Sequence, residues 1–149
     1  MMSRAEPVPF ATTLRVRDNC LCLHVQRAAR ALARRFDEVL RAVDLTNQQF
    51  SLLMSLNRPE PPGMGPVAEL LAIDRTTLTA ALKPLERRGL VRVEVDSRDR
   101  RGRLLRLTAQ GKRLLAEAAP IWQREHAEVD AALGAGEADR LRRNLRALE

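Results

Sequence analysis

Two long stretches of the chain repeat apolar residues at the spacing of an amphipathic helix. The first stretch runs from Leu14 to Val43, with arginines on its other faces. The second stretch begins after Thr108, a residue type that commonly caps helices. Gly134 and Gly136 interrupt it, so it predicts one long helix followed by a short final helix.

These helical flanks bear on how the chain is organised. We expect residues 14–45 and 114–149 to form a helical dimerisation region, because a single copy of the chain would leave part of their apolar stripes unburied. The alternative is that the flanks pack against each other within one chain. Residues 1–13 contain two prolines and show no period, so we expect a flexible N-terminal tail.

Between the flanks, residues 46–113 predict a helix, a short helix, a third helix and a hairpin. Thr46 and Gln49 fit a capping box at the start of the first of these helices. Pro66 suits the first position of the short helix. Asp74 suits the N-cap of the third helix. The fold class that follows is mainly α with a small β-hairpin.

The third helix has one apolar face and one polar face. Leu78, Leu82 and Leu85 recur at the spacing of a core-facing stripe. Beyond this helix, residues 91–95 alternate valine with charged residues and predict a half-buried strand. A polar turn over 96–102 leads to a return strand that begins at Leu104. Two helices joined by a tight turn and followed by such a hairpin indicate a winged helix-turn-helix.

The charge of the chain is concentrated in one block. The net charge is +7, and residues 74–113 hold 12 basic and five acidic side chains. A basic block of this kind is typical of a surface for a polyanion, either a nucleic acid or an anionic membrane, although a charged run is often only a solvated face. With three Phe, one Trp and no Tyr, the chain has few aromatics on which to stack single-stranded bases, so duplex DNA is the favoured partner.

A recognition helix places residues near its N-terminus against base edges in the major groove. Arginine can bind guanine with two hydrogen bonds, and threonine can contact a base edge, a thymine methyl group or a phosphate. The hairpin tip carries further arginines, which suit a narrow minor groove. The candidate DNA contacts are Arg75, Thr76, Thr77, Thr79, Lys83, Arg98, Arg100 and Arg101.

Four segments of this region resemble the MarR family of regulators. They are Ile73–Thr79 and Leu85–Val91 around the third helix, Asp96–Arg101 in the hairpin, and Leu107–Gly111 after it. The resemblance implies a homodimeric winged helix-turn-helix protein that usually represses nearby genes and is released from DNA by a ligand or by oxidation. It also implies binding of small aromatic or phenolic effectors between the dimerisation and DNA-binding lobes.

The resemblance also assigns roles within the hairpin. Asp99 would brace the wing, and Arg100 or Arg101 would enter the minor groove. Ala80 departs from the pattern, because many members have an arginine there, and this affects which bases the helix reads.

The sensing end leaves several hypotheses open. Cys22 lies where the branch of the family that senses organic hydroperoxides has its reactive cysteine, but this chain lacks the tyrosines that accompany it there. Cys20, Cys22 and His24 could instead bind a soft metal or metalloid, although one helix cannot direct all three at the same ion. The third reading is two ordinary reduced thiols at a dimer interface of a cytoplasmic protein.

Other functional classes fit less well. We expect no enzyme, because the two histidines are far apart and no glycine-rich phosphate loop is present. We expect no cofactor, no bound metal required for folding and no membrane partner. The remaining rival is a non-specific architectural DNA-binding protein, in which basic charge would be spread along the chain rather than confined to 74–113.

Overall fold

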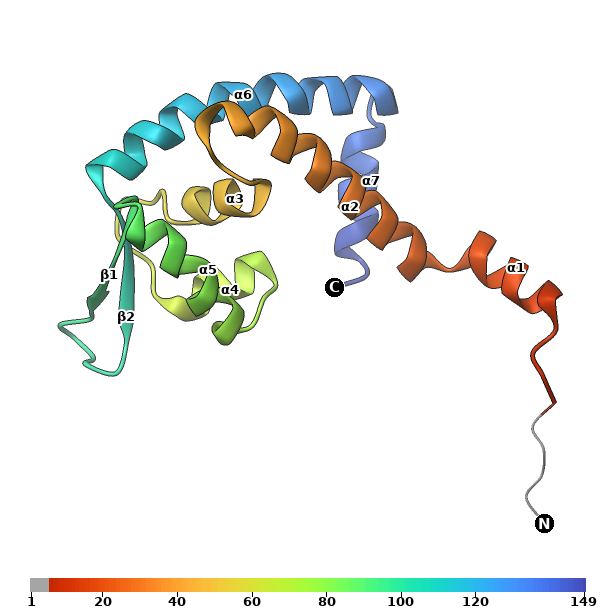
Figure 1. Cartoon of the computed structure of the whole chain (residues 1–149), viewed down its shortest axis with the longest axis horizontal. Coiled ribbons are helices and arrows are strands. Elements are labelled where there is room, and N and C mark those ends of the chain that lie inside the picture. Colours follow the sequence, from red (N-terminus) through yellow and green to blue (C-terminus); the bar gives the residue numbers. More distant parts are fainter. Residues whose placement is uncertain (1–5) are drawn as a thin grey trace, which may run out of the picture. The chain divides into compact units, whose positions relative to one another are not determined.

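The computed structural model describes residues 6–149, which form two compact units. The first unit ends at Arg35 and the second spans Phe36–Glu149. Helix α1 (Phe10–Asn19) and most of α2 (Leu21–Leu40) belong to the first unit (Figure 1). Within residues 6–149, no helix is long and apolar enough to cross a membrane.

The helices of the first unit differ from the sequence prediction in two ways. The stretch expected to be a flexible tail already becomes helical at Phe10, because Pro9 adopts the extended conformation of an N-cap and nothing in the next ten residues breaks a helix. The part of that expectation that concerns residues 1–5 lies outside the described residues. The single helix expected from Leu14 to Val43 is interrupted at Cys20, whose backbone is extended with ψ of 109°.

The same long helix also ends earlier than expected. Helix α2 ends at Leu40, and a 3₁₀ turn, η1, covers Arg41–Val43. Asp44 then adopts a left-handed conformation with φ of 54°. This residue type tolerates that conformation better than most, so the chain reverses there into α3.

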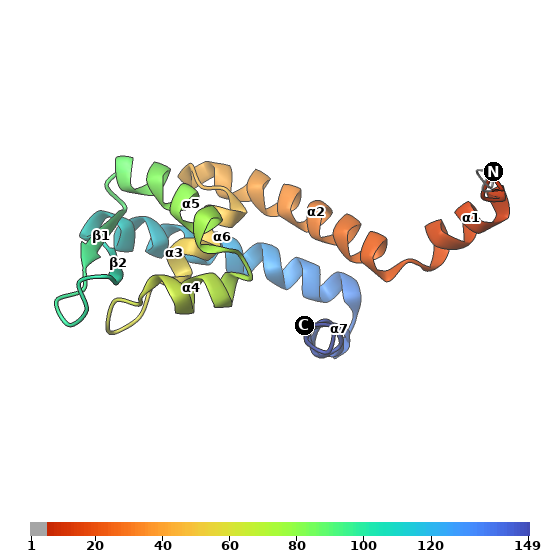
Figure 2. The same ribbon diagram turned by 90° about the horizontal axis from the view of Figure 1, so that it is seen from below.

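The second unit contains α3 (Asn47–Ser55), α4 (Met64–Leu71), α5 (Arg75–Arg87), α6 (Ala109–Leu133) and α7 (Glu137–Arg146). In Figure 1, α6 passes over α3, and α4 and α5 lie on the other side of α3. Figure 2 shows α7 end-on, so this last helix runs across the direction of α6.

Side-chain caps begin three of these helices, as the sequence predicts. Thr46 and Gln49 form the reciprocal capping box of α3, with both hydrogen bonds at 3.1 Å. Asp74 caps α5 and Thr108 caps α6. Helix α4 instead begins at Met64, two residues before the expected start at Pro66. Proline is tolerated there because backbone N–H groups in a first helical turn need no helical acceptor.

The hairpin consists of β1 (Val91–Val95) and β2 (Arg103–Leu107), paired antiparallel with Val91 opposite Leu107. Strand β2 begins one residue before the expected start at Leu104. The loop before α4 joins this sheet, because Leu105 N–H donates to the carbonyl oxygen of Pro62 at 2.8 Å. The hairpin is therefore attached to the loop before α4 at the middle of β2, as well as through its chain connections.

The apolar face of α5 lies in the core, as its spacing predicts. Leu78 and Leu85 are fully buried and Leu82 is 2% exposed. Burial of each such leucine contributes about 1.5–3 kcal/mol. Gly111, in the first turn of α6, fixes the other side of this core, since a Cβ there would lie 2.1 Å from the carbonyl oxygen of Leu90. These contacts hold α5 and the hairpin against the same core.

Candidate nucleic-acid interface

The N-terminal turn of α5 is exposed and ordered by Asp74. The Asp74 carboxylate accepts the backbone N–H of Thr77 at 2.6 Å. This hydrogen bond, with smaller contributions from the Thr77 hydroxyl and the Thr76 backbone, lowers the pKa of the Asp74 carboxyl. Arg75, Thr76 and Thr77 are all exposed beside the cap. The turn that a recognition helix presents to a groove is thus exposed.

Two side chains near the start of α5 have defined orientations. The Thr79 hydroxyl donates a hydrogen bond to the carbonyl oxygen of Arg75, one turn earlier, at 2.8 Å. The Nη2 atom of Arg75 lies 3.3 Å from where a Cβ on Gly65 would be, so this guanidinium extends back over the start of α4. This contact places the Arg75 guanidinium beside the first turn of α4.

Lys83 and Ala80 complete the exposed side of α5. Both are exposed, and they follow Thr76 and Thr79 at the spacing of one helical face. The absence of a long side chain at Ala80 leaves a smooth strip between Thr76 and Lys83. The helix therefore presents hydroxyls, methyl groups and one terminal ammonium group along this face.

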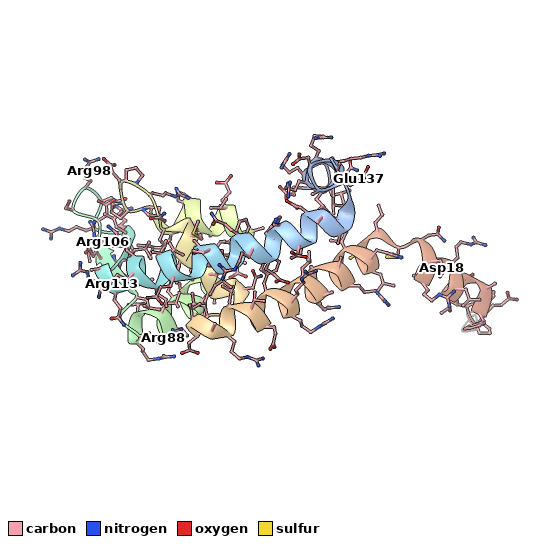
Figure 3. The ribbon with its side chains drawn as sticks, turned by 90° about the horizontal axis from the view of Figure 1, so that it is seen from above. Asp18, Arg88, Arg98, Arg106, Arg113 and Glu137 are labelled. Carbon is pink, nitrogen blue, oxygen red and sulfur yellow. The ribbon has the colours of Figure 1, made fainter. Side chains whose placement is uncertain are left out.

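The hairpin tip is held by two aspartates. The Asp99 carboxylate accepts the backbone N–H of Arg101 at 3.1 Å, and its carbonyl oxygen accepts the N–H of Gly102 at 2.8 Å. Asp96 accepts the N–H of Arg98 at 2.9 Å. Such turns leave the neighbouring side chains directed outward. Arg98, Arg100 and Arg101 are all exposed, and Figure 3 shows Arg98 at the outer end of the hairpin.

Sequence reasoning missed Arg103, which also supports the tip. Its Nη1 atom donates to the carbonyl oxygens of Arg100 and Gly102, at 3.2 and 3.1 Å. The only signal in the sequence was one further arginine after the polar turn. Arg103 thus adds charge at the tip while holding its backbone.

Farther along the hairpin, one glutamate is shared by two arginines. Both oxygens of Glu94 accept hydrogen bonds from Nε of Arg106 at 3.2 Å, and Arg92 lies 3.4 Å from the same carboxylate. Arg92 and Arg106 are opposite each other in the strand register. Glu94 therefore compensates part of the positive charge of the strands, and both the strands and the tip keep a net positive charge.

The candidate sensing residues surround the break between α1 and α2. Cys20 is half-buried, whereas Cys22 and His24 are exposed. The Nδ1 atom of His24 donates to the carbonyl oxygen of Cys20 at 2.8 Å, and Gln26 donates to the sulfur of Cys22 at 3.1 Å. Across residues 6–149, no three His, Cys, Asp or Glu side chains are placed to hold a metal ion. These three residues accordingly do not converge on a metal site.

An apolar cavity of about 410 Å³ lies in the second unit between α3, α4 and α6. Trp122 and Phe50 form one wall, stacked with their ring centroids 6.1 Å apart. Met54 and Leu70, 42% and 63% exposed, form the opposite rim. The volume falls within the range of small-molecule sites, which are mostly apolar with a few polar groups.

This chain is similar in sequence to a known family of proteins. The model of the MarR family matches residues 45–102, which include the helix-turn-helix and most of the hairpin. The transcriptional regulator HosA of Escherichia coli O157:H7 is 40% identical over 80 residues, which cover 52% of this chain and 58% of HosA. The match thus spans little more than half the length of this curated relative.

Solved structures extend the likeness over nearly the whole chain. The Mycobacterium tuberculosis regulator MosR, in complex with DNA, is 38% identical, with a TM-score of 0.79, covering 87% of this chain and 93% of MosR. The transcriptional repressor CouR, bound to a 23-mer DNA duplex, is 27% identical with a TM-score of 0.80, covering 96% of this chain and 99% of CouR. The capped recognition helix, the arginine-tipped hairpin and these likenesses agree: the chain belongs to the MarR family of transcriptional regulators.

Proposed function

We propose that this chain is a sequence-specific duplex-DNA-binding repressor whose affinity for DNA is changed by a small-molecule effector. The observation that carries the proposal is that one core holds both the exposed N-terminal turn of α5 and the arginine-rich hairpin tip. A helix of this kind fits the major groove, and arginines at a hairpin tip fit the adjacent minor groove. The regulators MosR and CouR, similar to this chain, have been solved with DNA.

Each proposed DNA contact has a role in this account. The first half of α5 contacts base edges and nearby phosphates through Arg75, Thr76, Thr77 and Thr79. Lys83 contacts a phosphate as a point charge. In the wing, Arg98 contacts the backbone, Arg100 or Arg101 enters the minor groove, and Asp99 holds the tip.

A homodimer would place two such lobes on a pseudo-palindromic site. We assign residues 46–113 to DNA binding, and residues 14–45 and 114–149 to dimerisation. Support comes from apolar side chains left exposed on α7, where Leu141 and Leu145 are 44% and 36% exposed. In this arrangement the half-sites lie about one helical turn apart.

The experiment is selection of duplexes from a randomised pool at one stated salt concentration. The proposal predicts enrichment of two inverted half-sites whose centres are about one helical turn, or 10–10.5 base pairs, apart. A pool that stays random after several rounds would favour the architectural alternative. Enrichment of a single asymmetric half-site would retain sequence reading and contradict the dimer.

The apolar cavity beside Trp122 is the proposed effector site. Its stacked aromatic wall suits a planar aromatic ligand, and its lining comes from α3, α4 and α6, so a ligand there would alter how α4 packs. Trp122 is the only tryptophan in the sequence and lies in the wall of this cavity, so its fluorescence responds to a ligand bound there. A series of aromatic carboxylates should include compounds that quench Trp122 and weaken DNA binding over the same concentrations. A Leu70→Arg variant, with the rim filled, should lose both responses.

A thiol-based signal is a second candidate, favoured by the position of the cysteines. Cys22 is exposed, and Cys20 lies at the break between α1 and α2. Oxidation of an exposed thiol to a sulfenic acid or a disulfide would change the backbone at this break. Mild hydroperoxide treatment should then abolish DNA binding, and a thiol reductant should restore it. DNA binding by Cys22→Ser should not respond to the hydroperoxide. Equal responses in the variant and the parent chain would remove this candidate.

A further inference from the structure

A small cavity on the second unit is lined by three cations from separate segments. It has a volume of about 70 Å³ and lies between the loop after α3, strand β2 and the first turn of α6. Arg58 and Asn57 come from the loop, Arg106 from β2 and Lys112 from α6. We call these four residues the basic cavity. None of them belongs to the DNA-contacting set described above.

Two of the cations are oriented by hydrogen bonds through one edge of the guanidinium. The Nε atom of Arg58 donates to the carbonyl oxygen of Ser55 at 3.0 Å. The Nε atom of Arg106 donates to both oxygens of Glu94 at 3.2 Å. Within residues 6–149, the Nη groups of these two arginines make no hydrogen bond. Each anchored guanidinium therefore keeps two NH₂ groups available for a ligand.

The charges around the cavity are not balanced. Arg58 and Lys112 form no ion pair within the described part of the chain, and Glu94, the carboxylate paired with Arg106, is shared with Arg92. Figure 3 shows Arg106 and Arg113 at the same end of the unit, and of these two only Arg106 lines the cavity. An anion placed here would gain charge-assisted hydrogen bonds without displacing an existing ion pair of Arg58 or Lys112.

The volume limits what such an anion can be. A water molecule occupies about 30 Å³ in the liquid, and drug-sized ligands occupy sites of about 300–1,000 Å³. A space of 70 Å³ suits one tetrahedral oxyanion. Arginine forks match phosphate oxygens with two parallel hydrogen bonds, and lysine adds a mobile point charge.

From this geometry we infer that the basic cavity binds a phosphoryl group. The group could come from a phosphate of the DNA backbone, which would extend the footprint beyond the recognition helix and wing. It could also come from a small phosphorylated molecule, which would make the cavity a second regulatory site. Phosphate binding at the basic cavity can be tested independently of the proposed DNA interface, because the first experiment uses protein without DNA.

The first experiment titrates the DNA-free full chain with inorganic phosphate at constant ionic strength, maintained with sodium chloride. Backbone amide shifts of Asn57 and Arg106 are followed by NMR. We expect saturable shifts, and Lys112→Gln should weaken phosphate binding at least about fivefold, as loss of a charge-assisted hydrogen bond implies. The matched control is Arg113→Gln, which removes an exposed charge from the next residue of α6 outside the cavity and should change affinity by less than about twofold.

Two results would overturn the inference. One is a shift that grows linearly with phosphate and never saturates. The other is an equal loss of affinity in Lys112→Gln and Arg113→Gln, which would reduce the effect to general surface charge. Because Lys112 is exposed, Lys112→Gln should retain the melting temperature of the parent chain. Arg58→Gln removes a different cation from the cavity and provides an independent test.

The second experiment distinguishes the two sources by adding a specific duplex. If the DNA backbone supplies the phosphoryl group, bound duplex should abolish the response to phosphate. Lys112→Gln should then reduce the slope of log affinity for DNA against log salt by about 1. If a small phosphorylated molecule supplies it, the response should persist on DNA, and the slope should match that of the parent chain.

Discussion

The Thr79 hydroxyl donates a hydrogen bond to the carbonyl oxygen of Arg75, so its hydrogen atom is already used within α5. The outward part of Thr79 that remains for DNA is its methyl group together with an accepting lone pair. We therefore propose that Thr79 reads a thymine methyl group by apolar contact. This assigns a different role to Thr79 than to the neighbouring threonines of the first turn.

Substitution of Thr79 separates its methyl group from its hydroxyl. Thr79→Val keeps the methyl group, and we expect near-parental affinity for the selected site. Thr79→Ser keeps the hydroxyl and removes a methyl group, which should weaken specific binding about fourfold, the equivalent of about 0.8 kcal/mol per buried carbon. Fluorescence anisotropy on specific and random duplexes measures both. A loss in Thr79→Val with no loss in Thr79→Ser would assign the contact to the hydroxyl.

The arginines at the hairpin tip should act mainly through phosphates and groove potential. Arg100→Ala and Arg101→Ala should each weaken binding and reduce the slope of log affinity against log salt by about 1. Arg124→Ala, which removes an exposed charge from the middle of α6, is the control and should leave the slope unchanged. Parental affinity and slope in both tip variants would show that the wing does not contact DNA.

Substitution of Asp99 changes both the charge and the hydrogen bonding of the tip, and these two effects should change DNA affinity in opposite directions. Asp99→Ala removes a negative charge from the tip, so electrostatics alone would strengthen DNA binding. It also removes the acceptor for the N–H of Arg101, so we expect binding to weaken. Asp99→Asn retains an acceptor oxygen and should restore most of the affinity. Tighter binding by Asp99→Ala would mean that the turn holds its shape without this hydrogen bond.

The caps of α3, α5 and α6 could be predicted because each depends on residues three positions apart in the sequence. Thr46, Asp74 and Thr108 needed only local chemistry. The break at Cys20 was not predicted, because the apolar spacing continues across it, although Asp18 and Asn19 before it are weak helix formers. The basic cavity was equally hidden, because Arg58 and Lys112 are brought together only by the packing of distant segments.

The cap of α5 makes a prediction for acid stability. Because the N–H of Thr77 lowers the pKa of Asp74 in the folded chain, the ionised carboxylate stabilises the fold above its ordinary pKa of about 3.9. This stabilisation is lost as the pH falls through the lowered folded value. Asn caps helices without titrating, so the melting temperature of the parent chain minus that of Asp74→Asn should be constant from pH 5 to 7 and should decrease below about pH 4.

Both proteins in that comparison retain Asp139, whose pKa Arg142 also lowers by a hydrogen bond. The difference between their melting curves therefore isolates Asp74. A difference that stays constant down to pH 2 would show that the carboxylate does not depend on its charge to cap α5.

If the chain reads DNA sequence, its affinity for a specific duplex must exceed its affinity for an unrelated duplex. Fluorescence anisotropy at one stated salt concentration would compare the duplex selected from the random pool with a scrambled duplex of equal length. The account predicts tighter binding to the selected duplex by at least about a thousandfold, the lower end for specific regulators. Affinities that agree within about threefold would contradict it, since binding would then rest on phosphate contacts alone.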